Sequence, residues 1–126
     1  MKKPLLSADQ QQRVNELVTT MTLAQKIGQM TQAERLNCTP AQAKNFHLGS
    51  IMCGAGSVPG NNKLKDWLQM ADSYWQSSSV KDECHHGIPL LFGVDAIHGH
   101  NNLSEATIFP HNIGLGAADD PALIKE

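Results

Sequence analysis

The sequence of 126 residues lacks a long apolar run and a strong excess of charge of either sign. Its 10 basic and 12 acidic residues give a net charge of −2, and no segment gathers the basic side chains that nucleic-acid binding requires. No stretch approaches the roughly 20 apolar residues of a membrane span. The composition therefore indicates a globular protein without nucleic-acid or membrane partners, and it is compatible with a neutral ligand such as a sugar.

The N-terminus lacks the signature of a secretory signal. The segment Met1–Ser7 begins with basic residues but has only Leu5 and Leu6 where an exported protein carries roughly 7 to 15 apolar residues. The compartment stays open. It is cytoplasmic if Met1 is the native start, and periplasmic or extracellular if a signal was removed.

Signatures of metal, redox and nucleotide sites are also missing. The three cysteines are an odd number without a CxxC pair, so we interpret them as free thiols of a small core. His98 and His100 alternate, but no Cys or acidic residue stands at a spacing diagnostic of zinc. The pair Gly54 and Gly56 lacks the third glycine of a dinucleotide-binding loop. No cofactor is predicted.

Three helix starts carry capping signals. Ser7 or Asp9 precedes an apolar stripe that continues to Met21, and Thr22 with Gln25 forms a capping box. The apolar face of that second helix consists of Leu23, Ile27 and Met30. Thr39 precedes a proline at the first helical position, which predicts a short helix over residues 41–46.

Two apolar runs predict buried strands. Residues 48–53 lead into a glycine-rich loop, Gly54–Gly60, and residues 90–94 are apolar without alternation, as in a strand buried on both faces. Between them, an apolar face that includes Trp67 and Trp75 predicts a long helix packed on the sheet. The order strand, helix, strand indicates a βαβ unit with parallel strands and an α/β fold. A further helix is predicted from Pro121.

The residues after the second strand form the most informative segment. Asp95 stands at the carboxyl end of the strand, where α/β folds bind ligands, and the loop that follows is rich in Gly, His and Asn. The Asp95 carboxylate has the chemistry to accept two hydrogen bonds from adjacent sugar hydroxyls. The alternative, equally weighted, is that it caps its own loop. Asn102 begins a formal glycosylation acceptor sequence, which we discount.

Four ordered segments, which together reach from Met21 almost to the end of the sequence, resemble family 3 glycoside hydrolases. They are Met21–Met30, Gly49–Ile51 with the glycine-rich loop, Gly93–Gly99 and Ala106–Ala117. The loop His100–Asn102 is most similar to the exo-β-glucanase and β-glucosidase branch.

The resemblance implies a (β/α)8 barrel, of which residues 1–126 would be an incomplete N-terminal segment with about two strands, followed in many members by an α/β sandwich. It implies retaining hydrolysis of terminal, non-reducing β-D-glucosyl residues by two carboxyl groups. The nucleophile and the acid/base lie further along the family's chain, so no catalytic residue is assigned here. Asp95 matches a sugar-binding aspartate, and Gly54, Ala55 and Gly56 resemble a loop that lines the same subsite.

Alternatives remain at this point. A fragment that binds sugar without cleaving it, a scaffold in which Asp95 only caps a loop, and a segment of a β-N-acetylglucosaminidase are each compatible with the sequence. A barrel needs eight strands. We therefore expect the 126-residue chain alone to be marginally folded and inactive.

Overall fold

The computed structural model describes residues 5–54 and 56–125. Their secondary-structure elements, in chain order, are α1 (Ala8–Thr20), α2 (Leu23–Gln29), β1 (Gln32–Glu34), the 3-10 helix η1 (Arg35–Asn37), α3 (Pro40–Asn45), β2 (Ser50–Cys53), α4 (Leu64–Ser79), β3 (Leu91–Val94), α5 (Asn112–Ala118) and α6 (Pro121–Lys125). The capping box predicted at Thr22 and the helix start predicted at Thr39 and Pro40 are confirmed, and Ser7 caps α1.

The three strands form one parallel sheet in the order β1-β2-β3. Its central pairing places Cys53 beside Val94, which confirms the predicted parallel βαβ unit. The sequence analysis missed β1, because its three residues Gln-Ala-Glu show no apolar run. The segment becomes a strand because its backbone pairs with β2, from Gln32 beside Ser50 to Glu34 beside Met52.

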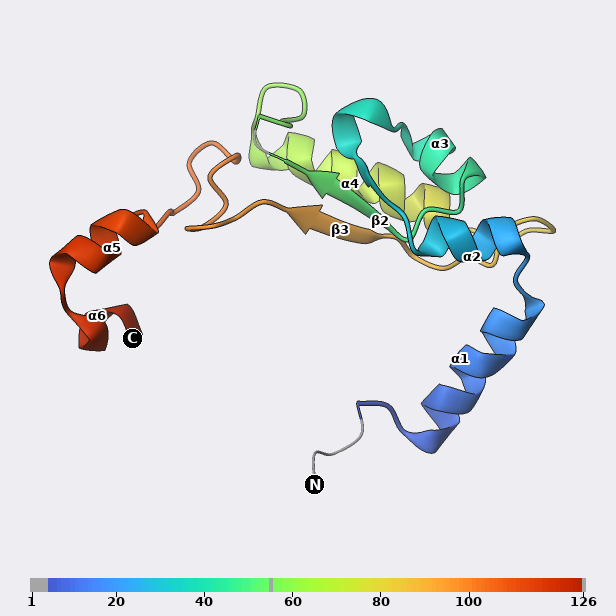
Figure 1. The fold of residues 1–126 in the computed structure, drawn as a ribbon. Helices are drawn as coiled ribbons and strands as arrows, with labels where there is room; N and C mark the ends of the chain where they lie inside the picture. Colours follow the sequence, from blue (N-terminus) through green and yellow to red (C-terminus); the bar gives the residue numbers. More distant parts are fainter. Residues whose placement is uncertain (1–4, 55, 126) are drawn as a thin grey trace.

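Helices α3 and α4 pack together on one side of the sheet, as Figure 1 shows. Beneath them Ile51 of β2 is fully buried, and Tyr74 of α4 is almost so. The core cluster consists of Cys38, Ala43, Leu48, Ile51, Tyr74 and Leu90. Trp67 is buried on α4 as expected, whereas Trp75 is 56% exposed, so its predicted packing on the sheet is wrong. Helix α4 turns only one stripe inward, and Trp75 lies outside it.

Helix α2 buries the side opposite to the predicted one. Leu23, Ile27 and Met30 are exposed, while Gln25 and Gly28 are buried. A close backbone approach decides the orientation: the Gly28 carbonyl oxygen accepts the Gly49 N–H at 2.9 Å. Hydrophobic side chains cannot come that close, so the helix turns its glycine inward.

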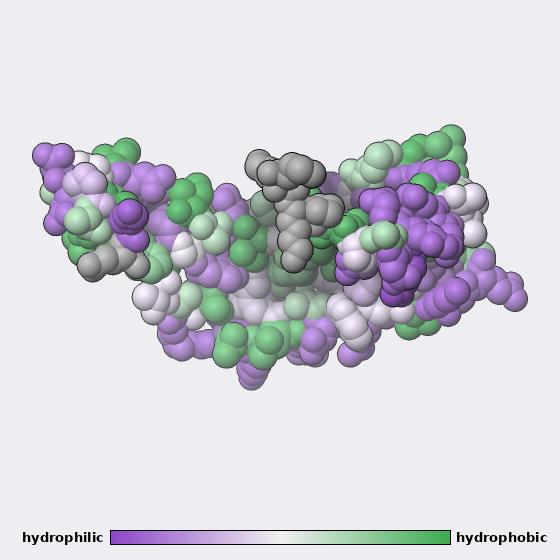
Figure 2. Space-filling model, turned by 90° about the horizontal axis from the view of Figure 1, so that it is seen from below, coloured by the Kyte–Doolittle hydropathy of each residue, from purple (hydrophilic) through white to green (hydrophobic). Residues whose placement is uncertain are grey.

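Strand β3 is not buried on both faces, contrary to the prediction. It forms one edge of the sheet, and Leu91 is 74% exposed although neighbouring Leu90 is buried. Figure 2 shows hydrophobic residues at the surface along the length of the molecule. An apolar strand without alternation needs cover on both sides, and among the described residues only one side of β3 has it.

The terminal helices lie away from the sheet. Figure 1 shows α1 extending beyond one end of the sheet, and α5 and α6 beyond the other. Within the described ranges none of these three helices has a buried residue. Helix α6 begins at the predicted proline, while α5 was not predicted, because two glycines interrupt its pattern. No helix in the described part of the chain has the length and hydropathy to cross a membrane.

Candidate functional site

The carboxyl ends of the three strands meet at one edge of the sheet, which we call the rim. Glu34 is the last residue of β1, while Gly54 follows β2 and Asp95 follows β3. Figure 1 shows β2 and β3 pointing away from α2 and toward the loops that form this edge. The Asp95 N–H donates to the Cys53 carbonyl at 3.2 Å, so the strand ladder holds Asp95 directly beside the glycine loop. The structure therefore brings together two regions that are about 40 residues apart.

The Asp95 side chain is half-buried. Among residues 5–54 and 56–125, no backbone or side-chain group donates a hydrogen bond to its carboxylate. The loop-capping alternative therefore has no donor in the described part of the chain. A carboxylate in this position retains its capacity to accept hydrogen bonds from a ligand.

The loop after β2 turns sharply away from the strand. Its Gly54 carbonyl accepts the Ser57 N–H at 3.0 Å, and Gly56 has a φ of 80°, in the left-handed region that favours glycine. A Cβ atom built on Gly56 would meet no atom within 4 Å, so its backbone borders open space. Ala55, the third residue predicted for this loop, lies outside the described residues.

Glu34 is a rim residue that the sequence analysis missed. One carboxylate oxygen accepts the Gly54 N–H at 3.1 Å, and the other accepts the Leu36 N–H at 3.3 Å. Hydrogen bonding with the Ser57 side chain, followed by these backbone contacts and the nearby Arg35, holds the pKa of Glu34 below its usual value. The carboxylate is thus committed to internal contacts. A three-residue polar strand gives no sequence signal for such a role.

Arg35 holds the glycine-rich loop through two hydrogen bonds. The Arg35 guanidinium donates to the Ser57 hydroxyl at 3.0 Å and to the Val58 carbonyl at 3.1 Å. Ser57 is almost completely buried. These contacts occupy two donor groups of the Arg35 guanidinium, so the arginine is a structural support of the loop.

Asn102 is the second missed residue. Its side chain is buried, with an exposed fraction of 9%, and its amide nitrogen donates to the Gly54 carbonyl at 2.7 Å. Its amide oxygen accepts the Gly56 N–H at 3.4 Å. Because the nitrogen that a glycan would modify is buried and engaged, the folded protein does not offer Asn102 for glycosylation. The sequence analysis considered Asn102 only as a formal glycosylation acceptor and therefore did not predict its structural role.

The histidines near the rim serve separate contacts. The Nδ1 atom of His98 lies 2.7 Å from the Phe109 carbonyl oxygen. His100 packs edge-on against Trp67, with ring centroids 4.6 Å apart. In the described part of the chain no three His, Cys, Asp or Glu side chains are grouped to hold a metal ion. The thiols differ from the prediction in one respect: Cys38 and Cys53 are buried, whereas Cys84 is exposed.

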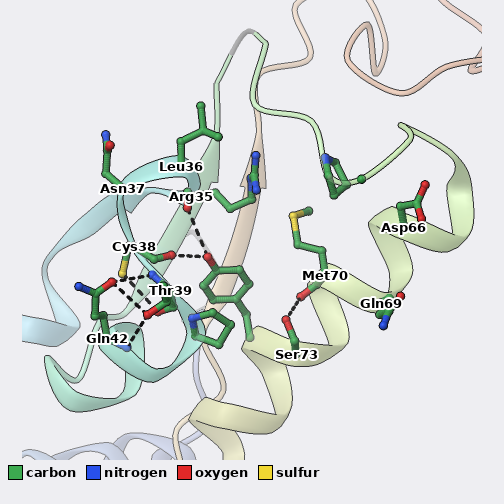
Figure 3. Close-up of a pocket in the computed structure, with 14 residues that line it drawn as sticks. Arg35, Leu36, Asn37, Cys38, Thr39, Gln42, Asp66, Gln69, Met70 and Ser73 are labelled. Carbon is green, nitrogen blue, oxygen red and sulfur yellow. Dashed lines mark hydrogen bonds between the residues drawn. The ribbon is translucent and has the colours of Figure 1, made fainter.

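A separate hollow lies between η1 and α4, and it is lined in part by Arg35, Pro59 and Gly60. It measures about 640 Å³, and Figure 3 shows the residues around it. Several of its polar side chains are engaged internally. The Tyr74 hydroxyl donates to the Cys38 carbonyl, and the Ser73 hydroxyl donates to the Met70 carbonyl. The rim remains the candidate site, because its Asp95 carboxylate has no donor among residues 5–54 and 56–125 and stands where parallel sheets bind ligands.

Comparison with known proteins agrees with this geometry. Residues 22–126 match the model of the glycosyl hydrolase family 3 N-terminal domain. The chain belongs to glycosyl hydrolase family 3. Its α/β fold, with a small parallel sheet, is that of the N-terminal part of the family's (β/α)8 barrel. This confirms the resemblance and the fold class derived from the sequence.

Three relatives of this family 3 chain are informative. A mutant of the exo-1,3/1,4-β-glucanase ExoP from a Pseudoalteromonas species superimposes on 94% of the chain, with a TM-score of 0.80 and 37% identity. The β-glucosidase from Listeria innocua in complex with isofagomine covers 87% of the chain, with a TM-score of 0.53 and 28% identity. The lysosomal β-glucosidase of Dictyostelium discoideum is 31% identical over 82% of the chain.

The family 3 chain spans a small part of these relatives. It covers 20% of the ExoP mutant, 14% of the Listeria enzyme and 14% of the Dictyostelium enzyme. The similarity therefore covers only the beginning of the barrel of these relatives. It does not by itself establish the activity of the complete protein to which this chain belongs.

Proposed function

We propose that this family 3 chain is the N-terminal segment, residues 1–126, of the (β/α)8 barrel of a β-glucosidase or exo-β-glucanase. The complete enzyme hydrolyses terminal, non-reducing β-D-glucosyl residues with retention of configuration. In this proposal, Asp95 and the backbone of Gly54, Ala55 and Gly56 bind the sugar whose bond is cleaved. The nucleophile, the acid/base and the α/β sandwich belong to the rest of the enzyme, and the substrate is a β-glucoside or β-glucan oligosaccharide.

The observation that carries the proposal is the position of Asp95. Its carboxylate stands at the carboxyl edge of a parallel sheet, where barrel enzymes bind substrate. The strand ladder holds its backbone, and no group in the described ranges engages its side chain. The hydroxyls of a β-glucoside are donors that a carboxylate accepts, and bonds that strengthen in the transition state raise the rate of cleavage.

The test uses the protein expressed from its complete reading frame and the chromogenic substrate p-nitrophenyl β-D-glucoside. We expect Asp95→Asn to lower kcat/KM by roughly 100-fold, because hydrogen bonds to a charged group contribute about 1.5–3 kcal/mol each. Asp72→Asn is the matched control, since Asp72 is exposed on α4 and lies outside the strand ends and loops that form the rim. It should leave kcat/KM unchanged.

The same variants separate the competing interpretations. Isofagomine binding without release of p-nitrophenol by the unsubstituted protein would indicate a module that binds sugar without cleaving it. Equal kcat/KM for the variants at Asp95 and Asp72 would indicate that Asp95 serves its loop and not the sugar. Faster hydrolysis of the N-acetylglucosaminide than of the glucoside would indicate a β-N-acetylglucosaminidase, the other enzyme considered in the sequence analysis.

The barrel assignment has its own test in the gene. We expect the reading frame to continue past Glu126 and to encode further strands, a nucleophilic Asp and a second domain that supplies a carboxylate. A stop codon directly after Glu126 would contradict the assignment.

A further inference from the structure

The backbone of Gly54 is held from two sides by side chains. Strand β2 ends its regular ladder at Cys53, so the polar groups of Gly54 need other partners. The Gly54 N–H donates to the Glu34 carboxylate at 3.1 Å, and its carbonyl accepts the Asn102 amide at 2.7 Å. Glu34 comes from the end of β1 and Asn102 from the loop after β3. The loops of both neighbouring strands thus converge on one residue.

Asn102 holds more than a single peptide group. Its amide oxygen accepts the Gly56 N–H at 3.4 Å while its nitrogen binds Gly54, so one side chain spans the turn between the two glycines. A primary amide is suited to this task because it offers a donor and an acceptor side by side. Burial of Asn102 removes the competition from water that would weaken both contacts.

We propose that Asn102 is a positioning residue that sets the place of the Gly54–Gly56 backbone relative to Asp95. The inference rests on the proposed function, in which both parts of the rim touch the sugar. Asp95 is tied to Cys53, the residue before Gly54, and Asn102 lies seven residues after Asp95 on the same loop. A shift of the glycine loop would therefore change the spacing between the two halves of the sugar site.

If Asn102 positions the glycine loop, its substitution should weaken sugar binding. If Asn102 only stabilises the fold, its substitution should leave the affinity of the folded protein unchanged. The Asn102→Ala variant should raise the KM for p-nitrophenyl β-D-glucoside and the Kd for isofagomine by about 5- to 10-fold, the effect of one or two net hydrogen bonds. Asn101→Ala is the matched control, since the neighbouring Asn101 is exposed. Both constants should remain unchanged in this control. A substitution that only lowers the amount of folded protein reduces the apparent kcat and leaves KM unchanged.

The Asn102→Asp variant adds a pH readout. When protonated, the introduced carboxyl donates to the Gly54 carbonyl as the amide does, and when ionised it repels that oxygen. The KM of N102D should therefore fall toward that of the unsubstituted protein as the pH is lowered, without a matching change in N101D. Glu34→Ala, which removes the contact on the other side of Gly54, should also raise KM, and it keeps the test decisive if N102A does not fold.

The outcomes separate the two proposals. If the unsubstituted protein cleaves the glucoside but N102A, N102D and E34A keep its KM and Kd, the positioning role is overturned while the proposed function stands. If the unsubstituted protein neither cleaves the glucoside nor binds isofagomine, the proposed function fails and the positioning role fails with it. The positioning role of Asn102 is supported if KM and Kd rise in the Asn102 variants and stay unchanged in the Asn101 variants.

Discussion

Gly28 on α2 and Gly49 just before β2 are hydrogen-bonded where two backbone segments approach closely, and neither position has room for a side chain. A Cβ atom on Gly28 would lie 2.1 Å from the Phe46 carbonyl oxygen, and one on Gly49 would lie 2.0 Å from the Gln29 carbonyl oxygen. The Gly49 N–H donates to the Gly28 carbonyl at 2.9 Å. This contact fastens α2 to the sheet at the end opposite the rim.

The first prediction concerns this contact. We expect Gly28→Ala to lower the free energy of unfolding by about 3 kcal/mol, because the obstructing atoms are backbone and cannot turn aside. Gly116→Ala on α5 is the control, since a Cβ there meets no atom within 4 Å. It should stabilise the protein by up to about 1 kcal/mol, as alanine does in a helix. Urea titration of the protein from the complete reading frame measures both, and equal stability of G28A and the unsubstituted protein would refute the contact.

A second prediction concerns stability in acid. His85 is 6% exposed, and its Nδ1 atom accepts the Gly87 N–H at 3.0 Å, which requires that nitrogen to be unprotonated. Burial, followed by the neighbouring His47 and Lys44, lowers the pKa of His85, while Asp82 partly opposes the shift. The unfolded chain therefore binds the proton more tightly. Stability is full above a pH of about 6.5 and is lost as the pH falls, by at most about 1.4 kcal/mol per pH unit for one proton.

Thermal melting between pH 5 and 7.5 checks this behaviour. The His85→Gln variant removes the titrating ring, so its stability should depend less on pH over the same range. The stacked partner His47, with its ring centroid 5.5 Å from that of His85, is left in place. Identical slopes for H85Q and the unsubstituted protein would show that His85 does not control the acid response.

A third prediction concerns Tyr74, whose hydroxyl donates to the Cys38 carbonyl within the core. Tyr74→Phe keeps the ring but leaves that buried carbonyl without this donor, so stability should fall by about 1–3 kcal/mol. Trp75→Phe, at the exposed neighbouring position, should change stability by less than about 0.5 kcal/mol. Denaturant titration gives both values. An unchanged free energy of unfolding in Y74F would mean that this hydrogen bond makes no net contribution to stability.

A fourth prediction concerns the thiols. Cys84 is exposed, whereas burial raises the pKa of Cys38 and of Cys53 and keeps them in the unreactive thiol form. Ellman's reagent should label Cys84 first, and the two buried thiols only upon unfolding. The Cys84→Ser variant should lose the fast phase. A fast phase that persists in C84S would place another thiol at the surface.

A fifth prediction follows from the barrel assignment and the open edge of β3. The isolated 126-residue chain should bind the dye ANS strongly and melt without a sharp transition, because Leu91 and other apolar side chains remain exposed. It should not hydrolyse p-nitrophenyl β-D-glucoside. The protein from the complete reading frame should bind little dye. A sharp cooperative melt of the isolated chain would contradict this expectation.

Local signals in the sequence predicted much of the chain's architecture. The caps at Thr22 and Thr39, and the proline that opens α6, depend on backbone groups within one helical turn. The apolar runs that become β2 and β3 and the helix between them are also local patterns. The family motifs led to the correct family and placed Asp95 at the end of a parallel strand. Its role in binding sugar stays a prediction.

Features that depend on distant neighbours were beyond the sequence. Strand β1 exists because β2 offers it a ladder, and α2 turns Gly28 inward because the backbone near Gly49 reaches it. The sequence analysis missed two rim residues: Glu34, which ends a three-residue polar strand, and Asn102, which lies in the loop after β3. Their partner Gly54 is 20 and 48 residues away, respectively.

The sequence by itself determined the capped helices, the two apolar strands β2 and β3, and the family to which the chain belongs, because capping, periodicity and motif order are local features of the chain. Only the tertiary structure decided which face of each element is buried and which side chains hold the rim. Those outcomes depend on how closely two backbones approach and on which orphaned N–H or carbonyl group finds a partner. Both depend on residues that are distant along the chain, so the residues next to a given position do not reveal them.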